Sequence, residues 1–296
     1  MISKTAMITI AGRPNVGKST LTNRLTGDKV AIVTPKPQTT RNRIYGVFTH
    51  GDTQMILLDT PGFHKARTRL GDYMVGIVKE SVADVDAVAL IVEPIDNIGT
   101  QEELLIQHIE NSGVPAILVI NKTDTVKVEL LLPVIESYSR RYNFEAIVPI
   151  SARKGDGVPQ LLEVLEKYAK EGPQLFPDGM TTDQPEKQII AEIIREKLLI
   201  CLDREIPHGT AVEITKFTER EDDEIIDVDA TIYCEKASHK GMIIGKHGAM
   251  LKKIGKMARE DIERFMGAKV YLQTWVKVKE NWRDSRTMMK NFGYVK

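Results

Sequence analysis

Residues 12–19 read Gly12-Arg-Pro-Asn-Val-Gly-Lys-Ser19, which fits the pattern G-x-x-x-x-G-K-[ST] of a phosphate-binding loop. A strand-like apolar run, Met7–Ala11, precedes this stretch, and a helical pattern begins near Thr20. In such a loop, glycines let backbone N–H groups converge on phosphate oxygens, and the following helix N-terminus adds positive potential. Lys18 can then reach the β- and γ-phosphates, and the Ser19 hydroxyl can bind Mg²⁺. The stretch predicts a nucleotide-binding α/β domain.

Two further segments are placed to sense the γ-phosphate. Asp59-Thr-Pro-Gly62 ends an apolar strand, so Asp59 is expected to hold Mg²⁺ through water and Gly62 to offer its N–H to the γ-phosphate. Gln38-Thr-Thr-Arg41 lies in the irregular connection after the first helix. A threonine there can bind Mg²⁺ and switch between order and disorder. Of Thr39 and Thr40, we favour Thr40.

The base is predicted to be guanine. Asn121-Lys-Thr-Asp124 follows the strand-like run Ala116–Ile120, and the Asp124 carboxylate can accept hydrogen bonds from guanine N1–H and the 2-amino group. Adenine has an unprotonated N1, so it would leave that carboxylate unpaired. Asn121 is expected to brace the loops, and the Lys122 stem to cover the ring. From Ser151-Ala152, the Ala152 N–H is expected to bind guanine O6.

These four motifs, in this order, resemble those of GTPases related to translation factors. Phe63 stands where a Ras-like enzyme has a water-orienting glutamine, which predicts slow intrinsic hydrolysis of GTP to GDP and phosphate. In the GTPases that this chain resembles, an asparagine at the position of Asn15 accompanies a bound K⁺ that stimulates hydrolysis. The alternative is that Asn15 only completes the turn of the loop. A base role for His64 is the less favoured alternative. The predicted catalytic residues are Lys18, Asn15, Thr40 and Gly62, and the predicted Mg²⁺ ligands are Ser19, Thr40 and Asp59.

The remaining nucleotide contacts come from the same motifs. The complete predicted nucleotide-binding set is Gly12, Arg13, Pro14, Asn15, Val16, Gly17, Lys18, Ser19, Thr20, Asp59, Thr60, Pro61, Gly62, Asn121, Lys122, Asp124, Ser151 and Ala152.

The alternation of strands and helices predicts two domains. Up to residue 171, buried strand-like runs alternate with amphipathic helical segments, which indicates a mostly parallel sheet covered on both faces. Arg43–His50 runs by a short turn into Thr53, which predicts one antiparallel edge strand. A linker rich in glycine and proline spans residues 172–185, so the domains are expected at 1–171 and 186–296. The order after the linker is α-β-β-α-α-β, an α+β domain.

The second domain contains a glycine-flanked loop, Ile244-Gly-Lys-His-Gly248. Between two helical stretches of an α-β-β-α-α-β unit, this is the arrangement of a type II KH domain, whose G-x-x-G loop clamps the backbone of single-stranded RNA. Lys252, Lys256 and Arg259 share one helical face. The predicted RNA-binding residues are Ile244, Gly245, Lys246, His247, Gly248, Lys252, Lys256 and Arg259. Trp275, Trp282 and Phe292 are expected to pack in the core.

The charge distribution supports a nucleic-acid partner. The chain of 296 residues has 41 basic and 41 acidic side chains, but residues 236–296 carry 15 basic and 5 acidic ones. A basic segment of this kind is typical of a surface that binds phosphate backbone. Ordinary composition excludes a disordered or collagen-like chain. Two cysteines and no long apolar run favour a cytoplasmic protein without a transmembrane segment.

Over essentially its full length, the chain resembles the Era family of bacterial ribosome-associated GTPases. The motifs above carry the resemblance, together with Pro35-Lys-Pro-Gln-Thr-Thr-Arg41, Glu205-Ile-Pro-His208 and Asn281-Trp-Arg283. It implies binding near the 3′ end of small-subunit (16S) ribosomal RNA, assembly of the 30S subunit, and peripheral association with the inner face of the cell membrane. A monomer is favoured. The alternatives are a constitutive RNA-binding chaperone and a membrane or cell-cycle signalling GTPase.

Overall fold

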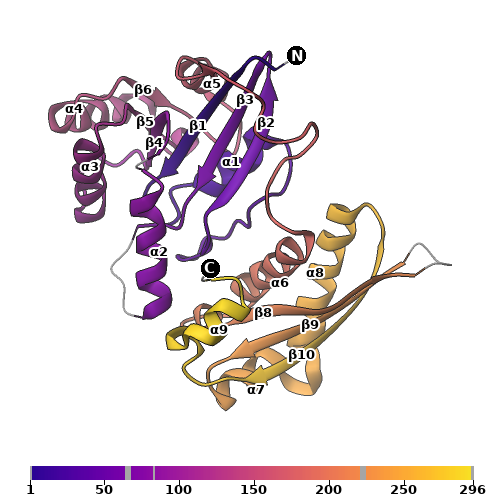
Figure 1. Ribbon diagram of the computed structural model, residues 1–296. Helices are drawn as coiled ribbons and strands as arrows, with labels where there is room; N and C mark the ends of the chain where they lie inside the picture. The colour runs from indigo at the N-terminus through magenta and orange to yellow at the C-terminus, as the bar shows by residue number, and fades with distance from the viewer. Residues whose placement is uncertain (1, 64–67, 83, 221–224, 295–296) are drawn as a thin grey trace. The chain divides into compact units, whose positions relative to one another are not determined.

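The computed structural model describes residues 2–63, 68–82, 84–220 and 225–294. By contacts within the chain it divides into two compact units (Figure 1). The first contains Met1–Ala31, Thr40–Ala66 and Gly71–Asp183. The second contains Gln184–Lys296 together with two short segments, Ile32–Thr39 and Arg67–Leu70. The segment 32–39 therefore belongs by its contacts to the second unit, although the chain enters and leaves it from the first.

A mostly parallel sheet forms the centre of the first unit. Its strand order is β2-β3-β1-β4-β5-β6, and β2 pairs antiparallel with β3 at the edge. The predicted antiparallel edge strand is thus confirmed. The strands are β1 (Lys4–Ala11), β2 (Ile44–His50), β3 (Thr53–Asp59), β4 (Ala87–Val92), β5 (Ala116–Ile120) and β6 (Ala146–Pro149).

Helices cover both faces of this sheet. One apolar core joins the sheet to α1 and α5 through Leu21 and Leu161, and a second joins the opposite face to α2, α3 and α4 through Val78, Leu105 and Val134. These helices are α1 (Lys18–Thr26), α2 (Arg69–Glu80), α3 (Thr100–Ser112), α4 (Leu131–Arg141) and α5 (Val158–Glu166).

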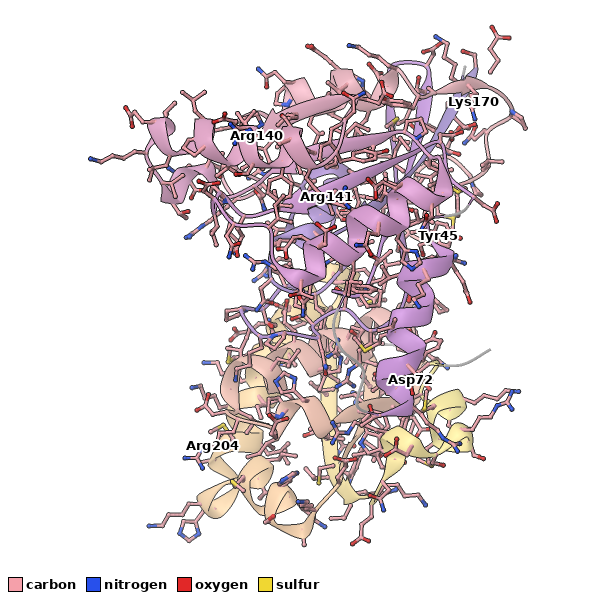
Figure 2. All side chains as sticks on the ribbon, turned by 90° about the vertical axis from the view of Figure 1, so that its left-hand side faces the viewer. Tyr45, Asp72, Arg140, Arg141, Lys170 and Arg204 are labelled. Atoms are coloured by element: carbon pink, nitrogen blue, oxygen red, sulfur yellow. The ribbon has the colours of Figure 1, made fainter. Side chains whose placement is uncertain are left out.

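An ion-pair network links two of these helices. Arg141 on α4 lies 2.7 Å from carboxylate oxygens of both Glu103 and Glu110 on α3; Figure 2 labels this arginine. Hydrogen bonds from the Arg141 guanidinium hold the pKa values of both glutamates below their usual range.

A two-residue strand was not predicted. The sequence suggests a helix continuing to Lys170, but α5 ends at Glu166 and β7 (Lys170–Glu171) pairs antiparallel with β1. A strand this short leaves no periodic signal in the sequence, because two residues cannot establish an alternation.

The second unit has the predicted α-β-β-α-α-β order. Its sheet runs β10-β9-β8, with β9 parallel to β10 and antiparallel to β8. One core unites the inner face of this sheet with three helices, through residues such as Ile194, Ile243 and Ile254. The elements are α6 (Glu186–Cys201), β8 (Ala211–Glu219), β9 (Ile225–Cys234), α7 (Ala237–Ile244), α8 (Ala249–Met266) and β10 (Lys269–Val278), followed by α9 (Arg286–Asn291).

The aromatic side chains near the C-terminus divide into two groups. Trp282 is fully buried, meets the Phe292 ring edge-on at 5.3 Å and donates from Nε1 to the Gly209 carbonyl at 2.9 Å. The expected packing is confirmed for these two rings. For Trp275 it is wrong, since this side chain is 44% exposed. Trp275 alternates along β10 with the buried Val276, so it points away from the helices.

Candidate functional site

The loop between β1 and α1 has the backbone that a phosphate-binding loop needs. Asn15 and Gly17 both have left-handed conformations, with φ of 66° and 103°. A β-carbon at Gly17 would collide with the amide nitrogen of Asn121. The loop is therefore packed directly against the segment predicted to bind the base, and only glycine fits where the two meet. The next predicted residue, Thr20, lies in the first turn of α1.

The Lys18 side chain folds back over this loop. Its Nζ donates to the carbonyl oxygens of Gly12 and Arg13 at 3.0 and 2.9 Å, and the residue is 6% exposed. Burial lowers the pKa of Lys18 to about 8, although the charge of Asp59 opposes the shift. A desolvated ammonium in this position attracts a phosphate strongly, since little water must be displaced.

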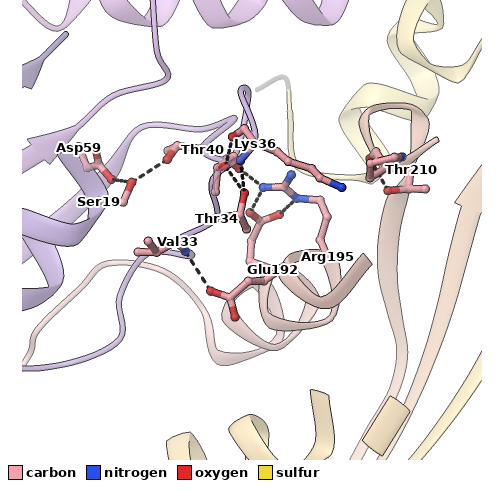
Figure 3. A network of polar contacts seen from close by, with 12 residues as sticks. Ser19, Val33, Thr34, Lys36, Thr40, Asp59, Glu192, Arg195 and Thr210 are labelled. Atoms are coloured by element: carbon pink, nitrogen blue, oxygen red, sulfur yellow. Dashed lines mark hydrogen bonds and ion pairs between the residues drawn. The ribbon is translucent and has the colours of Figure 1, made fainter. Parts of the chain in front are cut away.

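Three oxygen-bearing side chains converge at the start of α1 (Figure 3). The Ser19 hydroxyl donates to Asp59 Oδ2 at 2.6 Å and lies 2.9 Å from the Thr40 hydroxyl. Asp59 is fully buried, and its Oδ1 has no hydrogen-bond partner among the described residues. Burial raises the pKa of Asp59 to about 6. Hydroxyl and carboxylate oxygens, one of them buried and unpaired, fit a hard cation such as Mg²⁺.

The threonines at positions 39 and 40 have different contacts. The Thr39 hydroxyl donates to the Lys36 carbonyl oxygen at 2.7 Å and lies 2.8 Å from the Thr34 hydroxyl. The Thr39 side chain thus contacts nearby residues of the segment 32–39, within the second unit. The Thr40 hydroxyl instead reaches Ser19 in the first unit, and Thr40 is 6% exposed. This geometry favours Thr40 as the metal ligand.

The segment after β3 lies against the phosphate-binding loop. Thr60 donates its hydroxyl to the Ile10 carbonyl at 2.9 Å, and the Phe63 N–H donates to the Gly12 carbonyl at 3.3 Å. A β-carbon at Gly62 would lie 2.6 Å from Pro14. Phe63 is only 8% exposed and packs in the apolar core. His64 lies outside the residues that the structure describes.

The loops predicted to hold guanine contact one another. Asn121 Nδ2 donates to the Val16 carbonyl at 2.7 Å, and Asn121 Oδ1 accepts from the Ala152 N–H at 2.9 Å. The Ser151 hydroxyl donates to Asp124 Oδ1 at 2.8 Å. Asn121 therefore joins the loops as expected. The Ala152 N–H, expected to face guanine O6, is bonded to Asn121 in this structure.

Two acidic residues beside this region were not predicted from the sequence. Glu93 pairs with Arg13 and, at 2.5 Å, with Lys122 Nζ, while Glu102 lies 3.0 Å from Arg13 Nε. These carboxylates hold two predicted nucleotide-binding cations in place. The only sequence signal was the position of Glu93, directly after the apolar run of β4, where parallel strands place functional side chains.

The glycine-flanked loop of the second unit joins α7 to α8. Gly245 has φ 73° and ψ 175°, and a β-carbon there would lie 2.9 Å from the Met250 N atom. His247 has a left-handed φ of 51°, and Gly248 one of 78°. These conformations end α7 and start α8, so the loop lies between two helices, as the sequence predicts. Lys246 and His247 are exposed at the tip.

The helix after this loop has the two faces that the sequence predicts. Lys252, Lys256 and Arg259 are exposed, while Ile254, Ala258 and Ile262 are buried in the core. Ile243, the residue before the loop's Ile244, is fully buried in this core. Ile244 is half-buried at the edge of the same cluster. An exposed cationic face beside a glycine loop can neutralise the phosphates of a single strand.

Comparisons with known proteins agree with this geometry. The family described as 50S ribosome-binding GTPase matches residues 7–122, and the KH domain family matches residues 205–283. GTPase Era of Ruminiclostridium cellulolyticum is 52% identical over 99% of this chain and 98% of that protein. GTPase Era of Clostridioides difficile is 50% identical over 98% of each. The chain belongs to the Era family.

Solved structures of this family have the same architecture. A crystal structure of Era in complex with MgGDPNP and nucleotides 1506–1542 of 16S ribosomal RNA has a TM-score of 0.95 and 37% identity, over 99% of this chain and 100% of that one. An Aquifex aeolicus Era variant bound to GDP and AlF₄⁻ matches equally well.

Membership in the Era family confirms three predictions: the resemblance, the fold class and the GTPase class. That fold class is an α/β P-loop GTPase domain followed by a smaller α+β type II KH domain. Within the described part of the chain, no helix is long and apolar enough to span a bilayer.

Proposed function

We propose that this Era-family chain is a GTP-hydrolysing switch that binds small-subunit ribosomal RNA near its 3′ end and acts in assembly of the 30S subunit. One observation carries this proposal. The chain matches, over 99% of its length, an Era structure that holds MgGDPNP and a 16S ribosomal RNA fragment. The cationic face of α8 and the glycine loop before it supply the matching RNA-binding chemistry in this chain.

In the nucleotide site, each residue has a distinct task. Lys18 neutralises charge on the β- and γ-phosphates, and the backbone N–H of Gly62 binds the γ-phosphate. Ser19 and Thr40 would hold Mg²⁺ through their hydroxyls and Asp59 through water, and the metal would stabilise charge on the phosphate oxygens. Asp124 selects guanine, and Asn121 holds the surrounding loops together.

Hydrolysis is expected to be slow and stimulated by K⁺. Phe63 is buried and apolar, so its side chain cannot orient the attacking water. We assign K⁺ to Asn15, whose left-handed backbone lies at the centre of the phosphate-binding loop. Replacing K⁺ by Na⁺ at equal ionic strength should lower kcat, and Asn15→Ala should remove the difference. Equal rates in both salts would refute the K⁺ site and leave the GTPase assignment unchanged.

The proposed switch couples the nucleotide to RNA binding. The test measures affinity for a short single-stranded RNA matching the 16S 3′ end, with GDP and with a non-hydrolysable GTP analogue, across a salt series. We expect tighter binding with the analogue and weak binding of a scrambled RNA. Gly245→Asp should abolish binding, because a side chain and a negative charge would block the phosphates. Equal affinity in both nucleotide states would favour a constitutive RNA chaperone.

A signalling GTPase remains the alternative from another class. In that case, Gly245→Asp would abolish RNA binding in vitro without impairing growth or accumulating 30S precursors. Under our proposal, the same substitution impairs 30S assembly in cells. The small-subunit profile of the variant strain therefore distinguishes the two functions.

The remaining expectations concern organisation and location. We propose a GTP-binding domain at 1–171, a linker at 172–185 and a KH domain at 186–296, and limited proteolysis should cut first within 172–185. We also propose a cytoplasmic monomer that associates peripherally with the inner face of the cell membrane. Sedimentation and flotation with anionic vesicles measure these two properties.

A further inference from the structure

Helix α6 contains three consecutive charged residues that are almost fully buried. Arg195, Glu196 and Lys197 are 0%, 4% and 6% exposed. Lys197 Nζ lies 2.7 Å from Glu196 and also pairs with Asp261 on α8. Burial of charge is costly unless each group is paired. The apolar face of α6 packs in the KH core and Asp261 pairs with Lys197 there, whereas Arg195 and Glu196 have further contacts outside that core.

The covering segment is 32–39, the part of the switch region that belongs to the second unit. The Val33 N–H donates to Glu196 Oε1 at 2.9 Å. Lys36 Nζ donates to the carbonyl oxygen of Leu202, at the end of α6. Arg195 Nη2 donates to the carbonyl oxygen of Thr39. Three polar contacts along eight residues therefore hold this segment on α6, as Figure 3 shows for Val33 and Arg195.

The Arg195 guanidinium is held in one orientation by a neighbouring carboxylate. Glu192, one turn earlier on α6, accepts from its Nε at 2.8 Å and from its Nη2 at 2.5 Å. Although burial works against the charged form, the carboxylates of Glu192 and Glu196 keep the pKa of Arg195 above its usual range. The guanidinium is thus charged, buried and oriented, which makes its bond to the Thr39 carbonyl a strong one.

The Thr39 carbonyl belongs to the peptide bond that leads into Thr40. Fixing that carbonyl restricts the peptide plane, and with it the Thr40 N–H and the direction in which Thr40 leaves the loop. The Thr40 hydroxyl lies 2.9 Å from Ser19 in the described conformation. We infer that Arg195, on the KH-domain helix α6, is a positioning residue for the GTPase site, holding Thr40 ready to bind Mg²⁺ and the γ-phosphate.

This inference rests on the proposed role of Thr40 and predicts a selective effect. Thr40 serves the γ-phosphate state and not the GDP state. Loss of Arg195 should therefore weaken binding of a GTP analogue with Mg²⁺ by about tenfold, the equivalent of one charge-assisted hydrogen bond. Affinity for GDP should change less than about twofold. A merely structural role would weaken both nucleotides together, or neither.

The experiment is a double-mutant cycle on the full-length chain. Affinities for GDP and for a non-hydrolysable GTP analogue with Mg²⁺ are measured for Arg195→Gln, Thr40→Ala and the double variant. Lys187→Gln is the matched control, because it removes a cation from the same helix, near the Phe217 ring at 6.0 Å. We expect the double variant to bind the analogue no more weakly than Thr40→Ala alone, because Arg195 acts through Thr40.

The remaining outcomes separate the two assignments. If Thr40→Ala leaves the ratio of the affinities for the GTP analogue and for GDP unchanged, the proposed role of Thr40 is refuted. If Thr40→Ala is selective but Arg195→Gln is not, or if the two losses add, the positioning role of Arg195 is overturned. Should Arg195→Gln not fold, Arg195→Lys retains a cation with a single donor nitrogen, and the same cycle with it should give an intermediate, non-additive loss.

Discussion

Asn121 donates from Nδ2 to the carbonyl oxygen of Val16 at 2.7 Å, and this bond joins the base-binding loop to the phosphate-binding loop. The same side chain accepts from the Ala152 N–H at 2.9 Å and is 2% exposed. One buried amide thus holds together three loops that the sequence places far apart. The guanine site is therefore assembled by a residue whose main contacts are with backbone groups of the protein.

Asn121→Ala should destabilise the protein as well as weaken nucleotide binding. It leaves a buried carbonyl and a buried N–H without their partner, which lowers the free energy of unfolding by about 1–3 kcal/mol. Denaturant unfolding and GDP affinity measure the two effects. Asn97→Ala, at an exposed position of the same unit, is the control. Unchanged stability of Asn121→Ala would contradict the bracing role.

Asp124→Asn should reverse the preference for the base. Xanthine has a carbonyl where guanine has the 2-amino group, so an amide that donates a hydrogen bond replaces a carboxylate that accepts one. The Ser151 hydroxyl donates to Asp124 Oδ1 at 2.8 Å, and the amide oxygen of the new asparagine can accept the same hydrogen bond. We expect affinity to fall for GDP and rise for xanthosine diphosphate. Equal losses for both nucleotides would place the base elsewhere.

Mg²⁺ binding should depend on pH through Asp59. Burial raises the pKa of this carboxyl to about 6, so below that pH it carries a proton that must leave when Mg²⁺ binds. The affinity for Mg²⁺ in the nucleotide complex should therefore fall about tenfold per pH unit well below pH 6, and should level off above about pH 7. Lys18, with a pKa of about 8, stays protonated across this window.

Calorimetry of Mg²⁺ binding at several pH values checks this expectation. The nucleotide phosphates also titrate, so the contribution of Asp59 is the difference in slope between the unaltered chain and Asp59→Asn. Identical slopes for the two proteins would show that Asp59 does not take part in metal binding.

Lys252→Gln should weaken RNA binding through loss of one phosphate contact. Lys252 is exposed on the basic face of α8. The plot of log affinity against log salt for single-stranded RNA should become shallower by about 0.7, which corresponds to one phosphate contact. Arg140→Gln, on α4 of the first unit, removes an exposed cation that pairs with Glu136 and should leave the slope unchanged. A slope that responds equally to both substitutions would indicate a general charge effect.

Much of this protein can be predicted from local sequence. Gly12–Ser19, Asp59–Gly62, Asn121–Asp124 and Ile244–Gly248 are each continuous stretches. In each, the backbone conformation and the ligand-binding groups come from neighbouring residues. The strand and helix periods around them fix the side of the sheet on which they lie. For that reason, the fold class, the order of the long elements and the proposed nucleotide-site residues follow from spacing.

Tertiary structure alone decided the rest. Arg195 and Thr39 are 156 residues apart in the chain, and Arg13 and Lys122 share Glu93 only because separate strands end at one edge of the sheet. The exposure of Trp275 likewise depends on which face of β10 the helices cover. Such contacts leave no periodic or local signal, because their energy depends on burial and on the position of distant backbone groups. The sequence thus determined the chemistry of each loop, and packing determined which loops act on one another.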